Sequence, residues 1–419
     1  MHTHRVFASL ACAMLVASGA RCSGNAKGAL DGGGADVTTS DSPIDAGFSN
    51  ESSTHDDAGT EPTEVALLGC PQAGYAGAFT IGGSPFQLTV DTGSAELGVA
   101  SSTCTTCNVS PFYTPGATAI DEHATVSVSY VSGTGWSGEI IADDFGVPSS
   151  SISAMTRLVA IESQTGGFFT NEGCGFGTVP FAFQGIAGFG PDSLAKPGTD
   201  EPMGALASHG VPDVFAFALC GSGGELWLGG VDTSVATGPV QYTPLLNSDN
   251  YYGITIDDLQ VAATSLGLTS TDIGDVVVDT DTTEFELPSS VYAKARDAIA
   301  GTAYFQAHFG TSAWFDDAYC TTPLDASPPS LAAIDSGLPT FTLAVDDGAG
   351  GSFDVTLGAT DSYLQPIRKD GVLYYCPEIE ENTSGGTVLG AAVMRSLLVV
   401  IDRAATRVGF ASYGSCSAP

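Results

Sequence analysis

The sequence has few positive charges. Its 419 residues include only 12 Lys and Arg against 47 Asp and Glu, which gives a formal net charge of −35. A surface of this sign repels nucleic acid and anionic membranes, so we expect neither as a partner. Two explanations of the acidity stay open. An enzyme that works in acid avoids a large positive charge by having few bases, and a salt-adapted protein shows the same bias.

Motifs of metallo- and serine hydrolases are also missing. The six His residues show no metal-ligand spacing, and Gly-x-Ser-x-Gly does not occur. We therefore expect no metal and no organic cofactor. The longest apolar run near the N-terminus, residues 6–20, is too short to span a bilayer but has the length of a signal-peptide core.

Residues 1–22 are predicted to be a signal peptide. The small residues 18–20 offer an ordinary cleavage site, whereas Cys22 resembles a bacterial lipoprotein attachment cysteine, with an atypical Arg21 before it. Residues 23–64 are rich in Gly, Ser, Thr, Asp and Ala and are predicted to be a disordered tether. The protein is expected outside the cytoplasm, either secreted or held in a membrane by lipid on Cys22.

The composition of the chain favours strands and turns over a helical bundle. Hydrophobic residues make up 43%, and there are 53 Gly and 22 Pro. The length exceeds that of one ordinary domain and allows two lobes, each with its own core.

Two similar segments carry the candidate chemistry. Leu88-Thr-Val-Asp91-Thr-Gly-Ser94 and Val276-Val-Val-Asp279-Thr-Asp-Thr282 each end an apolar run in Asp-Thr, about half the globular length apart. Equivalent positions in two similar halves can bring two carboxyl groups together. Such a pair shares one proton, because like charges at close range do not both ionise cheaply. One member can then act as base towards a water while the other polarises a carbonyl.

Ten cysteines occur in the chain, and eight remain if Cys12 is removed with the signal and Cys22 is lipidated. Cys104-Thr-Thr-Cys107 could be a redox or zinc motif, but no second close pair or spaced His accompanies it. A local disulfide between Cys104 and Cys107 is the preferred interpretation for an exported protein.

Five segments in order resemble the pepsin-like aspartic endopeptidase family over about residues 65–416. They are the opening hairpin, residues 75–85, which leads into the first Asp-Thr motif; the flap-like hairpin, residues 126–138; two hydrophobic-glycine segments, residues 183–190 and 387–395; and the last hairpin, residues 399–411. The sequence is identified as an atypical member of that family. The Cys22 motif suggests a bacterial one.

The resemblance implies an all-β, bilobal fold with the active-site cleft between two pseudo-twofold-related lobes, residues 65–246 and 247–419. It implies that Asp91 and Asp279 are catalytic. It also implies site-supporting roles for the residues that follow them and a flap above the cleft that holds substrate. The supporting residues are Thr92, Gly93, Ser94, Thr280 and Thr282, and the flap residues are Tyr130 and Gly133.

Further disulfides are expected from the same two-lobed arrangement. Cys320 should pair with Cys376 inside the second lobe. The family brings both chain ends into one central sheet, which favours Cys70 with Cys416 and leaves Cys174 with Cys220.

The chain departs from the family pattern at two places in the site. Asp281 stands where the family has glycine, so a third carboxylate should raise the apparent pKa of the pair or distort the loop. Gly98 replaces a common tryptophan that would hydrogen-bond the flap tyrosine, and Trp136 is a candidate to fill the space. A further Asp-Ser-Gly, residues 335–337, is interpreted as a surface loop.

The expected function is hydrolysis of peptide bonds in a protein or peptide substrate by a monomer. Asp281 keeps an alternative open, a catalytically inactive pepsin-fold binding or inhibitor protein.

Overall fold

The computed structural model describes residues 61–130, 132–169, 174, 183–246, 251–316, 320–414 and 416. These residues belong to one compact unit. The expected signal peptide, the lipid site at Cys22 and nearly all of the expected tether lie outside the described residues. No helix in the described part of the chain is long and apolar enough to cross a membrane.

The first part of the chain is built almost entirely of strands. Its elements are β1 (Thr63–Cys70), β2 (Gly74–Ile81), β3 (Ser84–Asp91), β4 (Leu97–Ala100), β5 (Ile120–Ser129), β6 (Gly135–Gly146), β7 (Ser153–Thr165), β8 (Gly185–Gly188), η1 (Asp192–Leu194), α1 (Pro202–Ser208), β9 (Val214–Leu219), β10 (Gly224–Leu228), η2 (Thr233–Val235) and β11 (Gln241–Pro244).

The second part mixes strands with short helices. Its elements are β12 (Gly253–Ile254), β13 (Ile256–Val261), β14 (Thr264–Ser265), α2 (Ser270–Ile273), β15 (Val276–Val278), β16 (Phe285–Pro288), α3 (Ser289–Ala300), α4 (Ala303–Phe309), α5 (Ala313–Asp316), α6 (Leu331–Gly337), β17 (Phe341–Asp346), β18 (Ser352–Leu357), η3 (Ala359–Asp361), β19 (Leu364–Lys369), β20 (Val372–Pro377), β21 (Ile379–Asn382), β22 (Thr387–Leu389), α7 (Ala391–Met394), β23 (Leu397–Asp402) and β24 (Arg407–Ser412).

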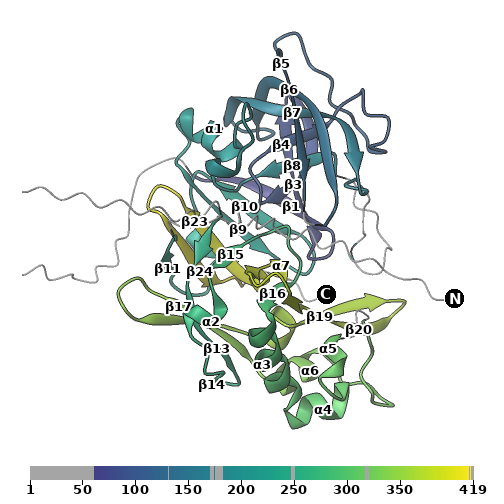
Figure 1. Cartoon of the computed structure of the whole chain (residues 1–419), viewed down its shortest axis with the longest axis vertical. Helices are drawn as coiled ribbons and strands as arrows, with labels where there is room; N and C mark the ends of the chain where they lie inside the picture. Colours follow the sequence, from purple (N-terminus) through teal and green to yellow (C-terminus); the bar gives the residue numbers. More distant parts are fainter. Residues whose placement is uncertain are drawn as a thin grey trace, which may run out of the picture. The chain divides into compact units, whose positions relative to one another are not determined.

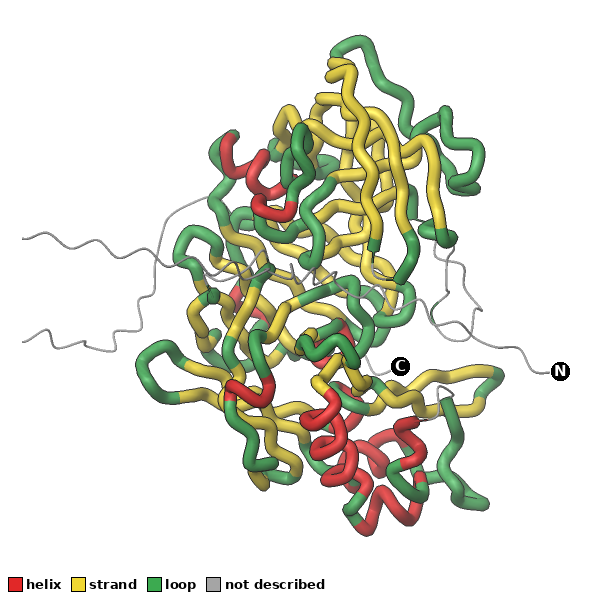
Figure 2. Tube along the Cα trace, in the orientation of Figure 1, coloured by secondary structure: helices red, strands yellow, loops and turns green. Residues whose placement is uncertain are grey.

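One large sheet joins the two ends of the described chain. It has 13 strands in the order β11-β24-β23-β9-β10-β1-β2-β3-β8-β4-β7-β6-β5. The C-terminal strands β23 and β24 therefore lie beside β9 and β11, which Figure 1 shows as yellow strands next to teal ones. The fold is mostly β, as the sequence predicted. Figure 2 shows that the helices gather in the second part of the chain, around α3 to α6.

The same three-strand arrangement occurs twice. In the first, β3 pairs in parallel with β8, and β8 pairs antiparallel with β4. In the second, β15 pairs in parallel with β22, and β22 pairs antiparallel with β16. β8 and β22 carry the expected hydrophobic-glycine segments. Parallel strands buried on both faces need continuous apolar runs, which explains why Val276–Val278 is wholly buried.

Four disulfides close the chain, and two join the expected pairs, Cys104–Cys107 and Cys320–Cys376. The other expected pairing was wrong: Cys70 bonds Cys174, and Cys220 bonds Cys416. The sheet order gives the reason. Cys220 directly follows β9, which is the neighbour of the C-terminal strand β23, whereas β1, which ends at Cys70, lies two strands further away.

The Asp-Ser-Gly segment, residues 335–337, also differs from expectation. It forms the end of helix α6 rather than a surface loop. Asp335 accepts hydrogen bonds from the backbone N–H and the hydroxyl of Thr360, at 3.0 and 2.8 Å, so its carboxylate holds η3 in place.

Candidate active site

Two loops at equivalent strand ends carry the paired motifs. Asp91 is the last residue of β3, and its strand partner on β8 is Gly188. Asp279 directly follows β15, and its backbone N–H donates to the carbonyl of Leu389 on β22, at 3.2 Å. The two repeated strand arrangements therefore present both aspartates at the same structural position.

Thr92 and Thr280 tie the two loops together. Each backbone N–H donates to the other threonine's hydroxyl, at 3.1 Å from Thr92 and 3.0 Å from Thr280. Each hydroxyl in turn donates to a carbonyl of the opposite strand, Val278 at 2.9 Å and Val90 at 2.7 Å. Both threonines are buried, so these four bonds are shielded from water.

The two carboxyl groups have matching hydrogen-bond partners. Asp91 accepts from the N–H of Gly93 at 2.7 Å and from the hydroxyl of Ser94 at 2.5 Å. Asp279 accepts from the N–H of Asp281 at 3.0 Å and from the hydroxyl of Thr282 at 2.8 Å. These bonds fix the orientation of both carboxyl groups.

The aspartates are buried and close together. Asp91 is 3% and Asp279 2% exposed, and their carboxyl groups are near enough to hydrogen-bond each other. A Cβ on Gly93 would lie 2.6 Å from Oδ2 of Asp279, so only glycine fits there. Burial and the charge of Asp279 raise the pKa of Asp91 well above its usual value, and burial raises the pKa of Asp279. The pair is therefore suited to share one proton.

Asp281 places a third carboxyl group beside the pair. Its backbone has no positive φ, and its N–H bonds Asp279 as that of Gly93 bonds Asp91, so the loop is not distorted. The carboxyl group points towards β2, where a Cβ on Gly74 would lie 2.8 Å from Oδ1 of Asp281. Gly74 thus supplies the room for it.

The pKa of Asp281 itself is raised well above its usual value. Burial is the main cause, followed by the negative charges of Asp91 and then Asp279. The pKa of Asp279 is raised as well, mainly by burial. Because the pKa of Asp281 is high, we expect Asp281 to keep its proton while the pair loses its first one. On this hypothesis the lower pKa of the pair is not raised by Asp281, in contrast to the expectation from the sequence.

The hairpin of β5 and β6 carries the expected flap residues. Tyr130 opens the turn, and its N–H donates to the carbonyl of Thr134 at 2.9 Å. Gly133 has a φ of +80°, which explains the glycine, and a Cβ there would meet open space. The negative charge of Asp91 contributes to the raised pKa of Tyr130, which places the tyrosine near the carboxyl pair.

Trp136 takes the place of the missing tryptophan. Its indole Nε1 donates to the hydroxyl of Tyr130, at 3.2 Å. A Cβ on Gly98 would lie 3.3 Å from two atoms of the same indole, so Gly98 leaves the space that the ring occupies. Tyr130 also stacks on Phe168, with ring centroids 5.7 Å apart. The tyrosine is therefore held on two sides.

Glycines in the two hydrophobic-glycine segments allow the loops to close. A Cβ on Gly188 would lie 2.6 Å from the carbonyl oxygen of Ser94, and one on Gly390 would lie 2.1 Å from that of Glu284. Ala391 donates its N–H to the carbonyl of Thr282 at 2.8 Å.

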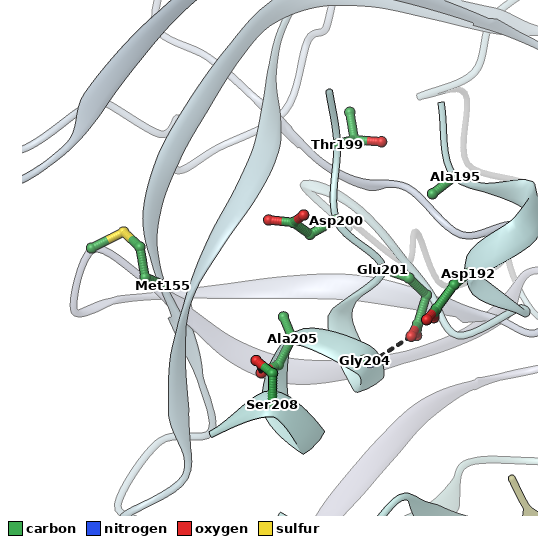
Figure 3. Close-up of a pocket in the computed structure, with 9 residues that line it drawn as sticks. All are labelled: Met155, Asp192, Ala195, Thr199, Asp200, Glu201, Gly204, Ala205 and Ser208. Atoms are coloured by element: carbon green, nitrogen blue, oxygen red, sulfur yellow. Dashed lines mark hydrogen bonds between the residues drawn. The ribbon is translucent and has the colours of Figure 1, made fainter. Parts of the chain in front are cut away.

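A separate pocket of about 330 Å³ lies beside α1 (Figure 3). It is lined by Met155, Asp192, Ala195, Thr199, Asp200, Glu201, Gly204, Ala205 and Ser208. Its acids already have partners: Asp200 pairs with Arg157, while Glu201 caps α1 and pairs with Arg403. We assign these acids a structural role. No group of three or more His, Cys, Asp or Glu in the described residues is arranged to hold a metal ion.

The sequence did not reveal every residue that shapes the site. The close approach of the Asp281 side chain to Gly74 joins distant parts of the chain, so no local pattern could show it. The same holds for Phe168, which stacks on the flap tyrosine from a different loop. The signal for Trp136 was indirect, namely the glycine at 98.

Comparisons with known proteins all lead to one family. The family model for eukaryotic aspartyl proteases matches residues 74–413. An "Aspartic protease" of Phaffia rhodozyma is 28% identical over 341 residues, 80% of this chain and 76% of that protein. A "Beta-secretase" of Strongylocentrotus purpuratus is 28% identical over 385 residues, 82% of this chain and 67% of that protein.

A third relative, "Aspergillopepsin-1" of Aspergillus oryzae, is 27% identical over 348 residues, 81% of this chain and 78% of that protein. These relatives are eukaryotic. They give no support to the expected bacterial origin or to an atypical place in the family.

Proposed function

The chain belongs to the aspartyl protease family, a family of peptidases, and we propose that it is an aspartic endopeptidase. Its substrate is an extended segment of a protein or peptide bound beneath the β5–β6 hairpin. The reaction is hydrolysis of a peptide bond by a water that Asp91 and Asp279 activate.

One observation carries the proposal: Asp91 and Asp279 lie close together, and each accepts a matching pair of hydrogen bonds from its own loop. The hydroxyls of Ser94 and Thr282 orient the carboxyl groups. Thr92 and Thr280 join the two loops. A purely structural pair of aspartates would not need to be buried at close range, because burying two like charges is costly. Preorganised groups of this kind are typical of catalytic sites.

The chemistry follows from the shared proton. The ionised member of the pair takes a proton from a water as it attacks the scissile carbonyl carbon, and the protonated member donates a hydrogen bond to the carbonyl oxygen. The resulting tetrahedral intermediate carries one hydroxyl group and one oxyanion, which accepts the hydrogen bond of the second carboxyl group, and both members of the pair are then protonated. It collapses when the amide nitrogen gains a proton from the pair and the C–N bond breaks. The pair then shares one proton again.

The substitutions Asp91→Asn and Asp279→Asn test this function. Asparagine has the same shape but neither holds the shared proton nor acts as base, so each variant should lose at least 99% of its activity. The assay is cleavage of unfolded haemoglobin at acid pH, with and without a statine-type transition-state analogue. Thermal unfolding of each variant checks that the fold persists. A variant that keeps substantial turnover would contradict the assignment.

The third carboxyl group favours a second candidate, a catalytically inactive binding or inhibitor protein with this fold. Asp281 adds a negative charge where the family has none, and an inactive protein tolerates that change more easily. The same assay separates the two. An inactive wild type that still binds the statine-type peptide would support the binding protein.

Export from the cytoplasm is part of the proposal. Four disulfides are typical of proteins that fold in an oxidising compartment. The lipid anchor at Cys22 is a separate proposal, tested by mass spectrometry of the mature N-terminus. A diacylglycerol modification on Cys22 would support the anchor, and a free N-terminus near residue 21 would support secretion.

A further inference from the structure

The position of the Asp281 carboxyl group is fixed from two directions. Its own N–H bonds Oδ1 of Asp279, at 3.0 Å, and its side chain reaches over Gly74 at the start of β2. The charge of Asp91 acts on it more strongly than that of Asp279, so it lies on the Asp91 side of the pair. The equivalent residue of the first loop, Gly93, lies against Asp279 in the same way.

The carboxyl group of Asp281 stands without a partner among the described residues. In the described part of the chain, no hydrogen bond joins a donor to either carboxyl oxygen of Asp281, although the residue is half-buried. No Lys or Arg contributes to the shifted pKa of Asp281, Asp91 or Asp279. The groups described here also offer no arrangement for a metal ion. The described residues therefore supply no positive charge to this cluster.

A third acid beside a proton-sharing pair is stable in one of two ways: it keeps its own proton, or a cation approaches it. In the free protein, burial and the charges of Asp91 and Asp279 favour the proton on Asp281, and a cation brought close to it would favour the ionised carboxylate instead. A bound substrate is the remaining source of a cation. An ammonium or guanidinium group forms a charge-assisted hydrogen bond with a carboxylate, and such bonds are stronger where water is partly excluded.

We propose that Asp281 is a specificity-determining residue that selects a lysine or arginine side chain of the substrate within three residues of the scissile bond. The inference rests on the proposed peptidase function, because it uses a peptide bound over the aspartate pair. It adds a substrate class to that function: polypeptides with a basic residue beside the cleavage site. The strongly negative chain would also attract such substrates.

The test compares pairs of statine-type peptides that differ only in lysine against norleucine. Six pairs place the lysine in turn at each of the three positions on either side of the statine. Binding to the full chain is measured by isothermal titration calorimetry at mildly acidic pH. For wild type, we expect lysine to bind about tenfold more tightly than norleucine at one position, as close charge pairs across an interface do.

Asp281→Asn removes the charge and keeps the shape, so the lysine-to-norleucine ratio should fall to about one. The ratio is taken within each variant, so a general loss of affinity cancels. Asp281→Gly provides a second variant if asparagine does not fold. Glu139→Gln, on the exposed face of β6, removes one charge away from the site and should keep the wild-type ratio.

Each outcome is informative. The inference is wrong if wild type prefers lysine at no position, or if the preference survives in Asp281→Asn. Cleavage of a parent substrate is measured in parallel. Cleavage without a lysine preference overturns the inference alone, while a lysine preference that depends on Asp281 but comes without cleavage overturns the peptidase and keeps the recognition site.

Discussion

At the scale of single residues, the residue after the second Asp-Thr sets how many protons the site holds. Asp91, Asp279 and Asp281 are three interacting acids, so their protons leave in macroscopic steps that belong to the group. Burial and the two neighbouring charges raise the pKa of Asp281 well above its usual value, so we expect the first step to occur while Asp281 is neutral. Asp281 acts on a later step, once it is ionised.

Asp281→Gly should therefore leave the acid limb of the kcat/KM profile in place and move the alkaline limb to lower pH. At an effective dielectric of about 20 and a separation of roughly 6 Å, the lost repulsion is about 3 kcal/mol. This is on the order of two pKa units as an upper limit. Removing the negative charge lowers the pKa of the second ionisation of the pair. The active form of the pair, which holds one proton, is therefore lost at a lower pH.

Initial rates on one fluorogenic peptide across pH measure both limbs of the Asp281→Gly profile. Asp281→Asn serves as the control, because it removes the charge and keeps the side-chain volume. It should show the same alkaline limb as glycine. A shift of the acid limb instead would mean that Asp281 ionises before the pair.

Trp136 and Tyr130 form the second residue-scale test. Trp136→Phe removes the indole donor, and the loss of one neutral hydrogen bond should lower kcat/KM about fivefold. Tyr130→Phe removes the acceptor. If this bond is how the tryptophan acts, adding Trp136→Phe to Tyr130→Phe should cost little more. Independent losses in the double variant would contradict the role, and urea unfolding shows whether stability changes instead.

Single residues near the motifs were the easiest to predict from the sequence. Ser94 and Thr282 lie two residues beyond their Asp-Thr pairs, and the structure gives both hydroxyls the same bond to a carboxyl oxygen. The proton order of the three acids could not be predicted, because it depends on burial and on distances across the two loops. That information appears only when both halves are folded.

At the scale of elements, the loop pair behaves as one unit. The hydroxyl of Thr92 accepts the N–H of Thr280 and donates to the carbonyl of Val278. Thr92→Val keeps the side-chain shape but leaves the buried N–H of Thr280 and the buried carbonyl of Val278 without this hydrogen-bond partner. This should cost about 2–4 kcal/mol of unfolding free energy and lower kcat, because the aspartates lose their alignment.

The chain offers a matched control for Thr92→Val in β3, the strand that directly precedes Thr92. Thr89 is also buried on β3, but its hydroxyl has no hydrogen-bond partner in the described structure. Thr89→Val should therefore be neutral or slightly stabilising. Urea denaturation compares the two variants, and equal losses would show that valine itself, rather than the lost bonds, is responsible.

Elements were predicted where local pattern and order agreed. Alternation and glycines indicated the β5–β6 hairpin, and the two hydrophobic-glycine segments became β8 and β22 with the residues that follow them. The disulfides show the limit. Which strands are neighbours in the 13-stranded sheet decides the pairing of Cys70, Cys174, Cys220 and Cys416. The sequence of a single strand does not determine that order.

At the scale of the whole molecule, the fold class followed from composition and from the order of the five segments. The distribution of acids did not. Glu284, Glu286 and Glu378 are carboxyl groups on adjoining parts of the second half, and burial raises the pKa of each. Net charge alone cannot distinguish such buried acids from the acids on the surface.

These acids predict a protein that is stable in acid and labile near neutral pH. A carboxyl group whose folded pKa is raised stays protonated in the folded state, while the unfolded chain ionises it from about pH 4.5 upwards. Its contribution to stability is therefore complete below that value. It is lost as pH rises through the folded pKa, which is about 7 for both Glu286 and Glu378.

Glu378→Gln tests the sign and the size of this effect. Glu378 is 2% exposed. The side-chain amide Nε2 of Gln72 donates to its Oε1 at 3.2 Å, a bond that the amide oxygen of a glutamine can also accept. Glutamine does not ionise, so the variant should lose about 3 kcal/mol less unfolding free energy than wild type between pH 4 and pH 8. Urea unfolding at both pH values measures this difference, and any loss that is the same at both values cancels. Exposed Glu139→Gln is the control and should follow wild type. If Glu378→Gln also follows wild type, ionisation of Glu378 is not a cause of the alkaline instability.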